Sequence, residues 1–314
     1  MKEEKIKEKT DKIYEFLSSE KIKNAVKVQS EIIRSAGEFL RKEGFIEIFP
    51  VIISPITDPL ADPNVKISFS LYGYPYQITK SMIFHKQISL LSLEKMFTFS
   101  PNLRIEPEEK KDSGKHLFEF TQLDLEVRNA RREEILSLGE RLLVHIIKSV
   151  KESSKKELDF FRRKLKIPKT PFGKVKFKDV YQKYQKNYED LLSRELGEPV
   201  WLIDFPIEIR EFYDREDKSQ PGYLVDMDLI FPEGYGEALS GGEREFEYEK
   251  ILKRIQRKNI DLSYFSFYLE IAKKGLYPSA GFGIGIERLT RYICGIERIE
   301  ETKLFPKIPG EFSL

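Results

Sequence analysis

Two stretches of the chain repeat their apolar residues at helical spacing. Between residues 25 and 40, the apolar positions are Ala25, Val28, Ile32, Ile33, Ala36, Phe39 and Leu40. Between residues 131 and 151, they are Ile135, Leu138, Leu142, Ile146 and Val150. Residues at this spacing share one face of an α-helix. We therefore predict two amphipathic helices that each bury one face, and shorter helices at residues 245–258 and 287–295.

Strand patterns occupy much of the remaining chain. The stretch FIEIFPVIISP (45–55) alternates and contains two prolines, which favours a strand at a sheet edge or at a boundary that faces a partner. Residues 97–128 predict two strands around the polar loop 107–115, and residues 200–206, 223–232 and 281–286 predict three more. Helices and strands do not alternate regularly, which argues against a doubly wound parallel sheet. We predict an α+β fold in which helices flank an antiparallel sheet.

The same patterns indicate the domain organisation. No internal repeat and no linker divides the chain, so we predict one domain over residues 23–314, preceded by a helical extension over residues 1–22. Residues 168–198 are rich in tyrosine and lysine and lack strong periodicity, which is typical of a small insertion. No apolar run approaches the roughly 20 residues needed to cross a bilayer. The lysine- and glutamate-rich start lacks the apolar core of a signal peptide. We expect a soluble, cytoplasmic protein with no membrane partner.

Charge and cysteine content narrow the classes of function. The 314 residues contain 54 Lys and Arg against 52 Asp and Glu, so the net charge gives no reason to expect a nucleic-acid-binding surface. The single cysteine, Cys294, excludes an internal disulfide framework and favours a reducing compartment. The three histidines are too few to favour a Cys/His zinc site.

The segment GFGIGIERL (281–289) places a glycine at every second position. Strand side chains alternate between faces, so Gly281, Gly283 and Gly285 leave one face bare while the residues between them point into the core. Glycine weakens a strand interior, so three in register indicate close approach by a ligand or by another backbone, although tight helix packing or a bulge gives the same pattern. The spacing is not that of a dinucleotide fingerprint. Arg288 follows at the strand-to-helix junction, within reach of a ligand on the bare face.

A second strand, FEFTQLDLEV (118–127), has one apolar and one polar face. The polar face carries Phe120, Gln122, Asp124 and Glu126. A half-solvated strand alternates in the same way, but an aromatic residue followed by hydrogen-bonding groups is typical of the floor of a binding site. Upstream, Arg104 and Glu106 also share a face. The planar guanidinium of Arg104 suits a phosphate or a carboxylate, and Glu106 suits an amino group. The charged loop 107–115 could move as a lid over them.

An acidic cluster follows in the next strand region. Asp226 and Asp228 lie on the same side of the strand at 223–232, and Glu237 and Ser240 follow a glycine-containing turn. Mg²⁺ typically takes one or two carboxylates together with water and phosphate oxygens, so Asp228 with Glu237 is a sufficient set. Two acids on a solvated strand face are also common without any ligand. Arg244 lies just beyond a glycine pair that permits close backbone approach.

These clusters, in this order, resemble the catalytic core of the class II aminoacyl-tRNA synthetases, in the aspartyl/asparaginyl branch. GFIEIFP (44–50) resembles motif 1, which builds the dimer interface in that family, and GFGIGIERL resembles motif 3. LRIE (103–106) with HLFEFTQLDLE (116–126) resembles motif 2. GEALSGGEREFEYEKI (236–251) resembles the branch-specific segment, in a form nearer the asparaginyl side. The resemblance extends from about residue 22 to the C-terminus and implies a class II fold, a homodimer and ATP-dependent amino-acid activation.

The resemblance implies an ATP site with Mg²⁺. Its ATP-binding residues would be Arg104, Glu106, His116, Leu117, Phe120, Glu237, Gly285 and Arg288. Arg104 would contact the α-phosphate and the reacting carboxylate, and Phe120 and Arg288 would cover the two faces of the adenine, so that the bare glycine face holds the nucleotide. Glu106 would contact the adenine amino group, and Arg288 and His116 the γ-phosphate. Arg104 and Arg288 would be the catalytic residues. The metal ligands would be Asp228, Glu237 and Ser240.

The resemblance also implies an amino-acid site. Its residues would be Asp58, Ser81, Lys86, Gln122, Asp124, Ser240 and Arg244. Lys86 and Arg244 can hold a carboxylate and Asp124 balances Lys86, which fits aspartate, whereas an asparaginyl enzyme usually carries a glutamate near Asp124. Ile83 stands where a glutamine is usual, and Ser279 where a histidine is common, so the edges of this pocket depart from the family pattern.

The N-terminal region decides between the hypotheses on function. The synthetases of this branch carry an anticodon-binding OB domain ahead of motif 1, for which the first 22 residues leave no room. We therefore expect tRNA not to be a partner. The hypothesis is an ammonia-dependent asparagine synthetase, a variant that the family contains: aspartate and ATP form aspartyl-adenylate and pyrophosphate, and ammonia then gives asparagine and AMP. Aspartate would bind reversed, with its α-carboxylate on Lys86 and Arg244 and its ammonium on Asp58 or Asp124.

Two alternatives belong to other classes. A truncated synthetase would aminoacylate tRNA or another carrier, and a non-catalytic paralogue would have kept only the fold. The presence of Arg104, Glu237 and Arg288 argues against a non-catalytic paralogue. The sequence leaves open whether ammonia or glutamine supplies the nitrogen, although Cys294, in a predicted helix, is expected to be packed rather than nucleophilic.

Overall fold

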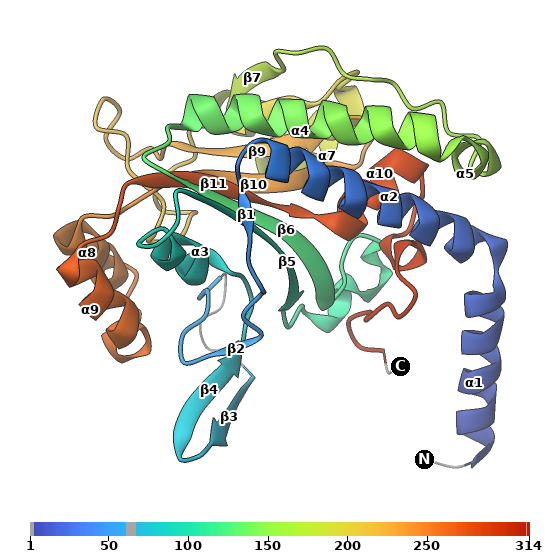
Figure 1. Cartoon of the computed structure of the whole chain (residues 1–314), viewed down its shortest axis with the longest axis horizontal. Helices are drawn as coiled ribbons and strands as arrows, with labels where there is room; N and C mark the ends of the chain where they lie inside the picture. The colour runs from blue at the N-terminus through green and yellow to red at the C-terminus, as the bar shows by residue number, and fades with distance from the viewer. Residues whose placement is uncertain (1–2, 61–66, 312) are drawn as a thin grey trace.

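An eight-stranded sheet forms the centre of the molecule (Figure 1). The computed structural model describes residues 3–60, 67–311 and 313–314. In spatial order the strands are β1 (Ile46–Glu47), β5 (Lys95–Leu103), β6 (Glu119–Arg128), β11 (Ser279–Gly285), β10 (Gly236–Arg244), β9 (Asp226–Phe231), β8 (Val200–Ile203) and β7 (Gly173–Lys176). The strands from β5 to β8 pair antiparallel, and only the outermost pairs, β1 with β5 and β7 with β8, are parallel. The sheet is therefore antiparallel at its centre, as the sequence predicts.

The two predicted amphipathic helices cover one face of this sheet. They are α2 (Glu20–Lys42) and α4 (Arg132–Ser153), which lie side by side in Figure 1. Their apolar stripes are buried in one core, where Val28 and Ile146 join Trp201 and Phe282 of the sheet. Burying a side chain of this size stabilises the fold by roughly 1.5–3 kcal/mol. The helical periodicity thus correctly predicts the faces that pack.

Shorter elements surround the sheet. The predicted helices at 245–258 and 287–295 are present as α8 (Tyr248–Arg257) and α10 (Ile286–Cys294). A second apolar cluster, around Phe84, Phe212 and Tyr268, packs α8 against α3 (Ile83–Ser89) and α9 (Ser266–Lys274). A separate three-stranded sheet contains β2 (Ile53–Ser54), β4 (Tyr74–Ile78) and β3 (Ser68–Leu71). Sequence periodicity does not predict β3, β4, α3 or α9, although α9 is as long as the predicted α10.

The segments predicted as an N-terminal extension and as an insertion both contain regular structure. Helix α1 (Glu3–Ser18) lies within the extension. Residues 168–198 contain α6 (Phe177–Tyr184) and α7 (Tyr188–Glu195), together with β7, which forms one edge of the main sheet. Helix α5 (Lys155–Phe160) links α4 to this region. The domain boundaries themselves stay predictions.

Four 3₁₀ turns complete the secondary structure of the described residues. They are η1 (Glu108–Ser113), η2 (Gln185–Asn187), η3 (Leu262–Phe265) and η4 (Ile299–Thr302). The turn η1 occupies the loop that the sequence predicts between two strands, here β5 and β6. None of the helices in the described part of the chain is both long enough and apolar enough to cross a membrane.

Candidate active site

Two adjoining cavities open on the sheet face opposite α2 and α4. The larger has a volume of about 310 Å³ and the smaller about 60 Å³. Arg104, Gln122, Glu237 and Gly283 line both cavities, so the two form one continuous site. They come from β6, β10, β11 and the end of β5, because these neighbouring strands turn their polar positions to the same face.

The structure gathers each set of sequence-predicted residues in one cavity. The larger cavity is lined by all the residues expected to bind the amino acid: Asp58, Ser81, Lys86, Gln122, Asp124, Ser240 and Arg244. The smaller is lined by all those expected to bind ATP: Arg104, Glu106, His116, Leu117, Phe120, Glu237, Gly285 and Arg288. Asp58 and Arg288, 230 positions apart in the sequence, thus share one continuous site, and the roles of the individual residues stay predictions.

The bare glycine face differs in one respect from its expected use. Gly283 lies beneath the side chains of β6: a Cβ there would be 2.7 Å from Gln122 Nε2. A Cβ at Gly281 would be 2.4 Å from Glu126 Oε2 and 2.2 Å from a backbone oxygen. Gly281 lines neither cavity, because the space above it is filled by a buried carboxylate of this protein. Gly283 lines both cavities although Gln122 lies close above it, and Gly285, which lines the smaller cavity, has only ordinary contacts above it.

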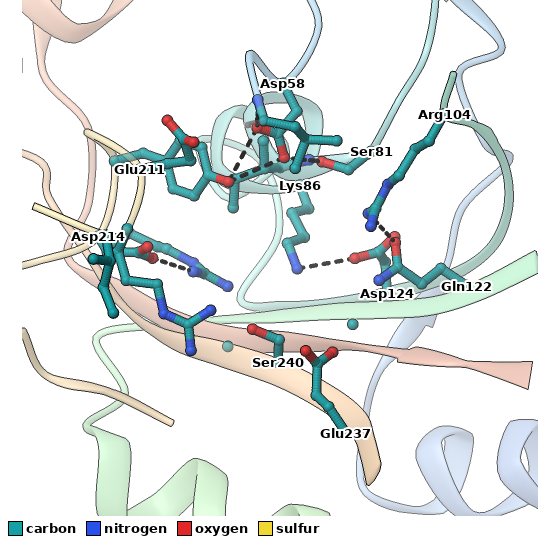
Figure 2. A pocket seen from close by; sticks show the side chains of 18 residues that line it. Asp58, Ser81, Lys86, Arg104, Gln122, Asp124, Glu211, Asp214, Glu237 and Ser240 are labelled. Atoms are coloured by element: carbon teal, nitrogen blue, oxygen red, sulfur yellow. Dashed lines mark hydrogen bonds and ion pairs between the residues drawn. The ribbon is translucent and has the colours of Figure 1, made fainter. Parts of the chain in front are cut away.

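A chain of buried ion pairs lies along the wall of the larger cavity, and Figure 2 shows one of them, the pair of Lys86 with Asp124. Lys86 Nζ, from α3, lies 3.0 Å from Asp124 Oδ1 and 3.5 Å from Glu126 Oε2. Arg244 Nε lies 3.2 Å from Glu126 Oε1, and its Nη1 lies 2.9 Å from Asp214 Oδ1. The expected pair of Lys86 with Asp124 is present. Asp124 Oδ2 has no hydrogen-bond partner among the described residues, although this side chain is almost fully buried.

Only Glu237 of the acidic cluster lines both cavities, and the sequence-predicted metal ligand Asp228 lies behind it and lines neither. Glu237 and Ser240 line the larger cavity, and the pairing of β9 with β10 places Ser240 opposite Asp228. Arg210 Nη2 lies 2.6 Å from Asp228 Oδ2, whereas Asp228 Oδ1 is buried and has no hydrogen-bond partner in the described part of the chain.

This donor set fits a magnesium ion that also takes ligands from a phosphate chain. It offers a cavity-facing carboxylate, a hydroxyl and an unsatisfied carboxylate oxygen. No cluster of three or more histidine, cysteine, aspartate or glutamate side chains in the described residues forms a complete metal site by itself. The phosphates would therefore have to supply the remaining ligands.

The smaller cavity combines two guanidinium groups with an aromatic ring. The Arg104 guanidinium lies 4.9 Å from the centre of the Phe120 ring, at cation–π distance. Arg288 Nη1 donates to the Glu237 backbone oxygen at 2.9 Å and lies 3.2 Å from Glu237 Oε1. Glu106 is paired with Lys110 of η1 at 2.6 Å. The cations and the aromatic face suit a phosphorylated, aromatic ligand.

His116, at the edge of the smaller cavity, is expected to be neutral in the free protein. Burial, Lys110 and Arg288 lower its pKa from 6.5 to about 4. The unfolded chain binds a proton at this histidine at a higher pH than the folded protein does. The free energy of unfolding should therefore decrease as the pH falls from about 6.5 towards 4. A His116→Gln variant identifies the His116 imidazole signal in the NMR spectrum of the wild type, because the variant lacks that signal. In an NMR titration of the wild type, this signal should not shift between pH 5.5 and pH 8. A midpoint near 6.5 would contradict this environment.

Sequence reasoning misses several side chains that line the site. Arg210, Glu211, Tyr213 and Asp214 line the larger cavity from the loop 204–225, between β8 and β9. Glu189 of α7 accepts a hydrogen bond from the Glu237 backbone nitrogen at 2.9 Å, which places the region 168–198 beside the acidic cluster. The only sequence signal is the density of charge in EIREFYDRED (208–217), which is also typical of a solvated loop.

Comparisons with known proteins agree with this geometry. The profile of the family described as tRNA synthetases class II (D, K and N) matches residues 5–309. An asparagine–tRNA ligase of Koribacter versatilis is 30% identical over 304 residues, which cover 90% of this chain and 68% of that protein. An asparagine–tRNA ligase of Pyrococcus abyssi is 28% identical over 310 residues, which cover 94% of this chain and 70% of that protein.

A solved structure gives the same result. The crystal structure of asparaginyl-tRNA synthetase from Pyrococcus horikoshii, complexed with asparaginyl-adenylate, matches with a TM-score of 0.85 at 28% identity. The match covers 93% of this chain and 70% of that structure. The predicted α+β fold, a sheet flanked by helices, is confirmed. This chain therefore belongs to the class II (D, K and N) tRNA synthetase family, and it contains a ligase-type catalytic core related to that of the asparagine–tRNA ligases.

Proposed function

We propose that this protein uses ATP and Mg²⁺ to activate aspartate and transfers the aspartyl group to ammonia. In the first step, a carboxylate oxygen of aspartate bonds to the α-phosphorus of ATP, and the bond to pyrophosphate breaks. In the second, the ammonia nitrogen bonds to the acyl carbon, AMP leaves with the electron pair of the broken bond, and the nitrogen loses a proton. The products are asparagine, AMP and pyrophosphate.

The observation that carries this proposal is the continuity of the two cavities at Arg104, Gln122 and Glu237. A carboxylate in the larger cavity can meet the inner phosphorus of a nucleotide in the smaller one at this junction. Arg104 and Arg288 would stabilise the charge that develops during the displacement. Glu237 and Ser240, with Asp228 behind them, would hold Mg²⁺, which supplies further neutralisation of the phosphates. No covalent link to the protein is required.

The charges of the larger cavity favour aspartate as the substrate. Lys86 and Arg244 lie beyond the junction and can hold the second carboxylate. We propose the reversed orientation, in which this is the α-carboxylate and the β-carboxylate meets Arg104. Activation of the β-carboxylate is what a free asparagine product requires.

Ammonia, rather than glutamine, is the nitrogen source that this chain supports. A cysteine-based glutaminase needs an accessible thiolate. Cys294 is the single cysteine, it is buried in α10, and burial raises the pKa of its thiol to about 12. It would stay protonated at neutral pH.

A second candidate function is transfer of the activated amino acid to tRNA or another carrier. It is favoured by the asparagine–tRNA ligases among the relatives.

We also propose a homodimer: motif 1 contains β1, the edge strand of the main sheet, and the adjacent Phe49 is 95% exposed. An apolar edge of this kind is normally covered by a partner.

One assay separates the two functions. Purified protein is incubated with aspartate, ATP and Mg²⁺, with ammonium, glutamine or unfractionated tRNA as alternative acceptors. We expect equal amounts of AMP and asparagine with ammonium, and neither asparagine nor aminoacylated tRNA in the other arms. Mass spectrometry of the amino acids and acid-precipitable label on tRNA provide the readouts. Charged tRNA together with no free asparagine would refute the proposal and support the alternative.

A further inference from the structure

The loop 204–225 gives one end of the larger cavity an acidic wall. Glu211 and Asp214 line the cavity on the side away from Arg104 and Glu237 (Figure 2). Tyr213, between them in sequence, donates its hydroxyl hydrogen bond to Asp58. Burial raises the pKa of Glu211 to about 7, and the neighbouring Asp58 and Asp214 add to this effect. These carboxyl groups therefore share one region of low solvent exposure.

The negative charges at this end are not all balanced by the protein. The acidic and basic side chains that line the larger cavity are five carboxylates and four cations: Asp58, Asp124, Glu211, Asp214, Glu237, Lys86, Arg104, Arg210 and Arg244. Arg244 is shared between Asp214 and the buried Glu126, and Lys86 between Asp124 and Glu126. The cation nearest Glu211 is Lys258, at 3.5 Å and outside the cavity lining.

An unsatisfied acceptor in the same cavity also points to a ligand. Asp124 Oδ2 belongs to a side chain that is 4% exposed and has no hydrogen-bond partner among the described residues. A buried carboxylate oxygen without a donor is costly, and a hydrogen-bond donor on a bound ligand removes this cost. A ligand that brings both a carboxylate for Arg244 and an ammonium for the surplus carboxylates is a zwitterionic amino-acid head group.

Asp58, one of the two sequence-predicted acceptors, is already engaged. Its Oδ2 accepts from Ser81 at 2.8 Å and from Tyr213 at 3.0 Å, and its Oδ1 accepts from Tyr213 and from the Leu60 backbone nitrogen. These neutral donors fill most of the lone pairs of this carboxylate. Glu211 and Asp214 have fewer partners, and Asp214 lies directly beside Arg244.

We propose that Glu211 and Asp214 bind the α-ammonium group of aspartate, while Arg244 and Lys86 hold the adjacent α-carboxylate. This assignment rests on the proposed function, because it places the amino-acid head group at the far end of the cavity and the β-carboxylate at the junction. In this assignment, the loop 204–225 recognises a free amino acid whose head group lies at the end of the cavity away from the junction.

The test compares aspartate with succinate, which keeps both carboxylates and lacks the ammonium group. Dissociation constants of both ligands are measured by calorimetry, without ATP or ammonia, for the wild type, Asp214→Asn, Glu211→Gln and the control Glu208→Gln. Glu208 is in the same loop, but its side chain is 60% exposed and lies outside the cavity lining. Each cavity variant should weaken aspartate binding about 10- to 100-fold and change succinate binding less than about 3-fold. The control should match the wild type.

The outcomes separate this assignment from its simpler alternatives. If Asp214 serves only to orient Arg244, Asp214→Asn weakens both ligands equally, and that result removes Asp214 from the ammonium site. An unchanged aspartate-to-succinate ratio in both cavity variants overturns the proposal and returns the role to Asp58 or Asp124. A wild type that binds aspartate but forms no asparagine refutes the proposed function alone. A wild type that does not bind aspartate refutes both.

Discussion

Replacing Arg288 by alanine is expected to lower aspartate-dependent exchange of label between pyrophosphate and ATP by about 10²- to 10³-fold. Arg288 lies at the start of α10 and lines the smaller cavity, and its Nη1 is held against Glu237. Its guanidinium is thereby fixed beside the region where we place the phosphates. A preorganised donor of this kind acts most strongly on charge that develops in the transition state, so the loss should appear mainly in kcat.

The exchange assay and a thermal melt of the same variant distinguish a catalytic loss from a folding defect. The Arg288 side chain is 35% exposed, so its removal leaves no deeply buried charge without a partner. Arg257→Ala is a matched control, because Arg257 is 62% exposed and lies outside both cavities. An Arg288→Ala protein that melts like the wild type and keeps exchange within about 5-fold would remove Arg288 from the catalytic residues.

Replacing Arg244 by methionine is expected to lower the free energy of unfolding by about 3–5 kcal/mol. The Arg244 side chain is 4% exposed and lies between two buried carboxylates, Glu126 and Asp214, and its Nη2 also donates to the Gly281 backbone oxygen at 3.0 Å. Methionine keeps most of the volume and removes the charge. The two carboxylates then stay buried without this cation, which is the origin of the large cost.

Urea denaturation measures this effect, and a second substitution identifies its cause. Adding Glu126→Gln to Arg244→Met removes one of the uncompensated charges and should restore part of the lost stability. The matched control is Arg257→Met, whose exposed pair with Glu208 contributes no more than about 1 kcal/mol. A loss below about 1 kcal/mol for Arg244→Met would contradict the buried ion-pair arrangement.

This structural role changes how substitutions at Arg244 can be interpreted. Arg244 is expected to hold the substrate carboxylate, so a higher KM for aspartate in an Arg244 variant would be the direct test of that role. Because Arg244 also holds Glu126 and Asp214, the same rise in KM would follow from disorder of the cavity wall. The aspartate-to-succinate comparison avoids this ambiguity, since it measures a difference between two ligands of one protein.

Much of the candidate site is predictable because strand alternation alone assigns residues to faces. Gln122 and Asp124 had to share a face of β6, and the glycines of β11 had to share one face of their own strand, although Glu126 fills the space above Gly281. The motif resemblance then ordered these strands within a known type of core. Periodicity in α2 and α4 identified the opposite, buried face in the same way.

Local backbone geometry repeats with a fixed period, so the order of residues along the chain assigns the core positions of the regular elements and the polar positions that share the functional face. The pair of Lys86 with Asp124 was expected from the motif resemblance, whereas the pairs made by the loop 204–225 depend on tertiary folding. Asp214 lies 30 residues before Arg244, and Arg210 meets Asp228 from an irregular loop. Such a loop has no period from which side-chain directions can be read, so its contacts depend on how β8 and β9 close it over the cavity. The acidic wall that we assign to the substrate ammonium is formed by this loop, where it lies over the cavity between β8 and β9.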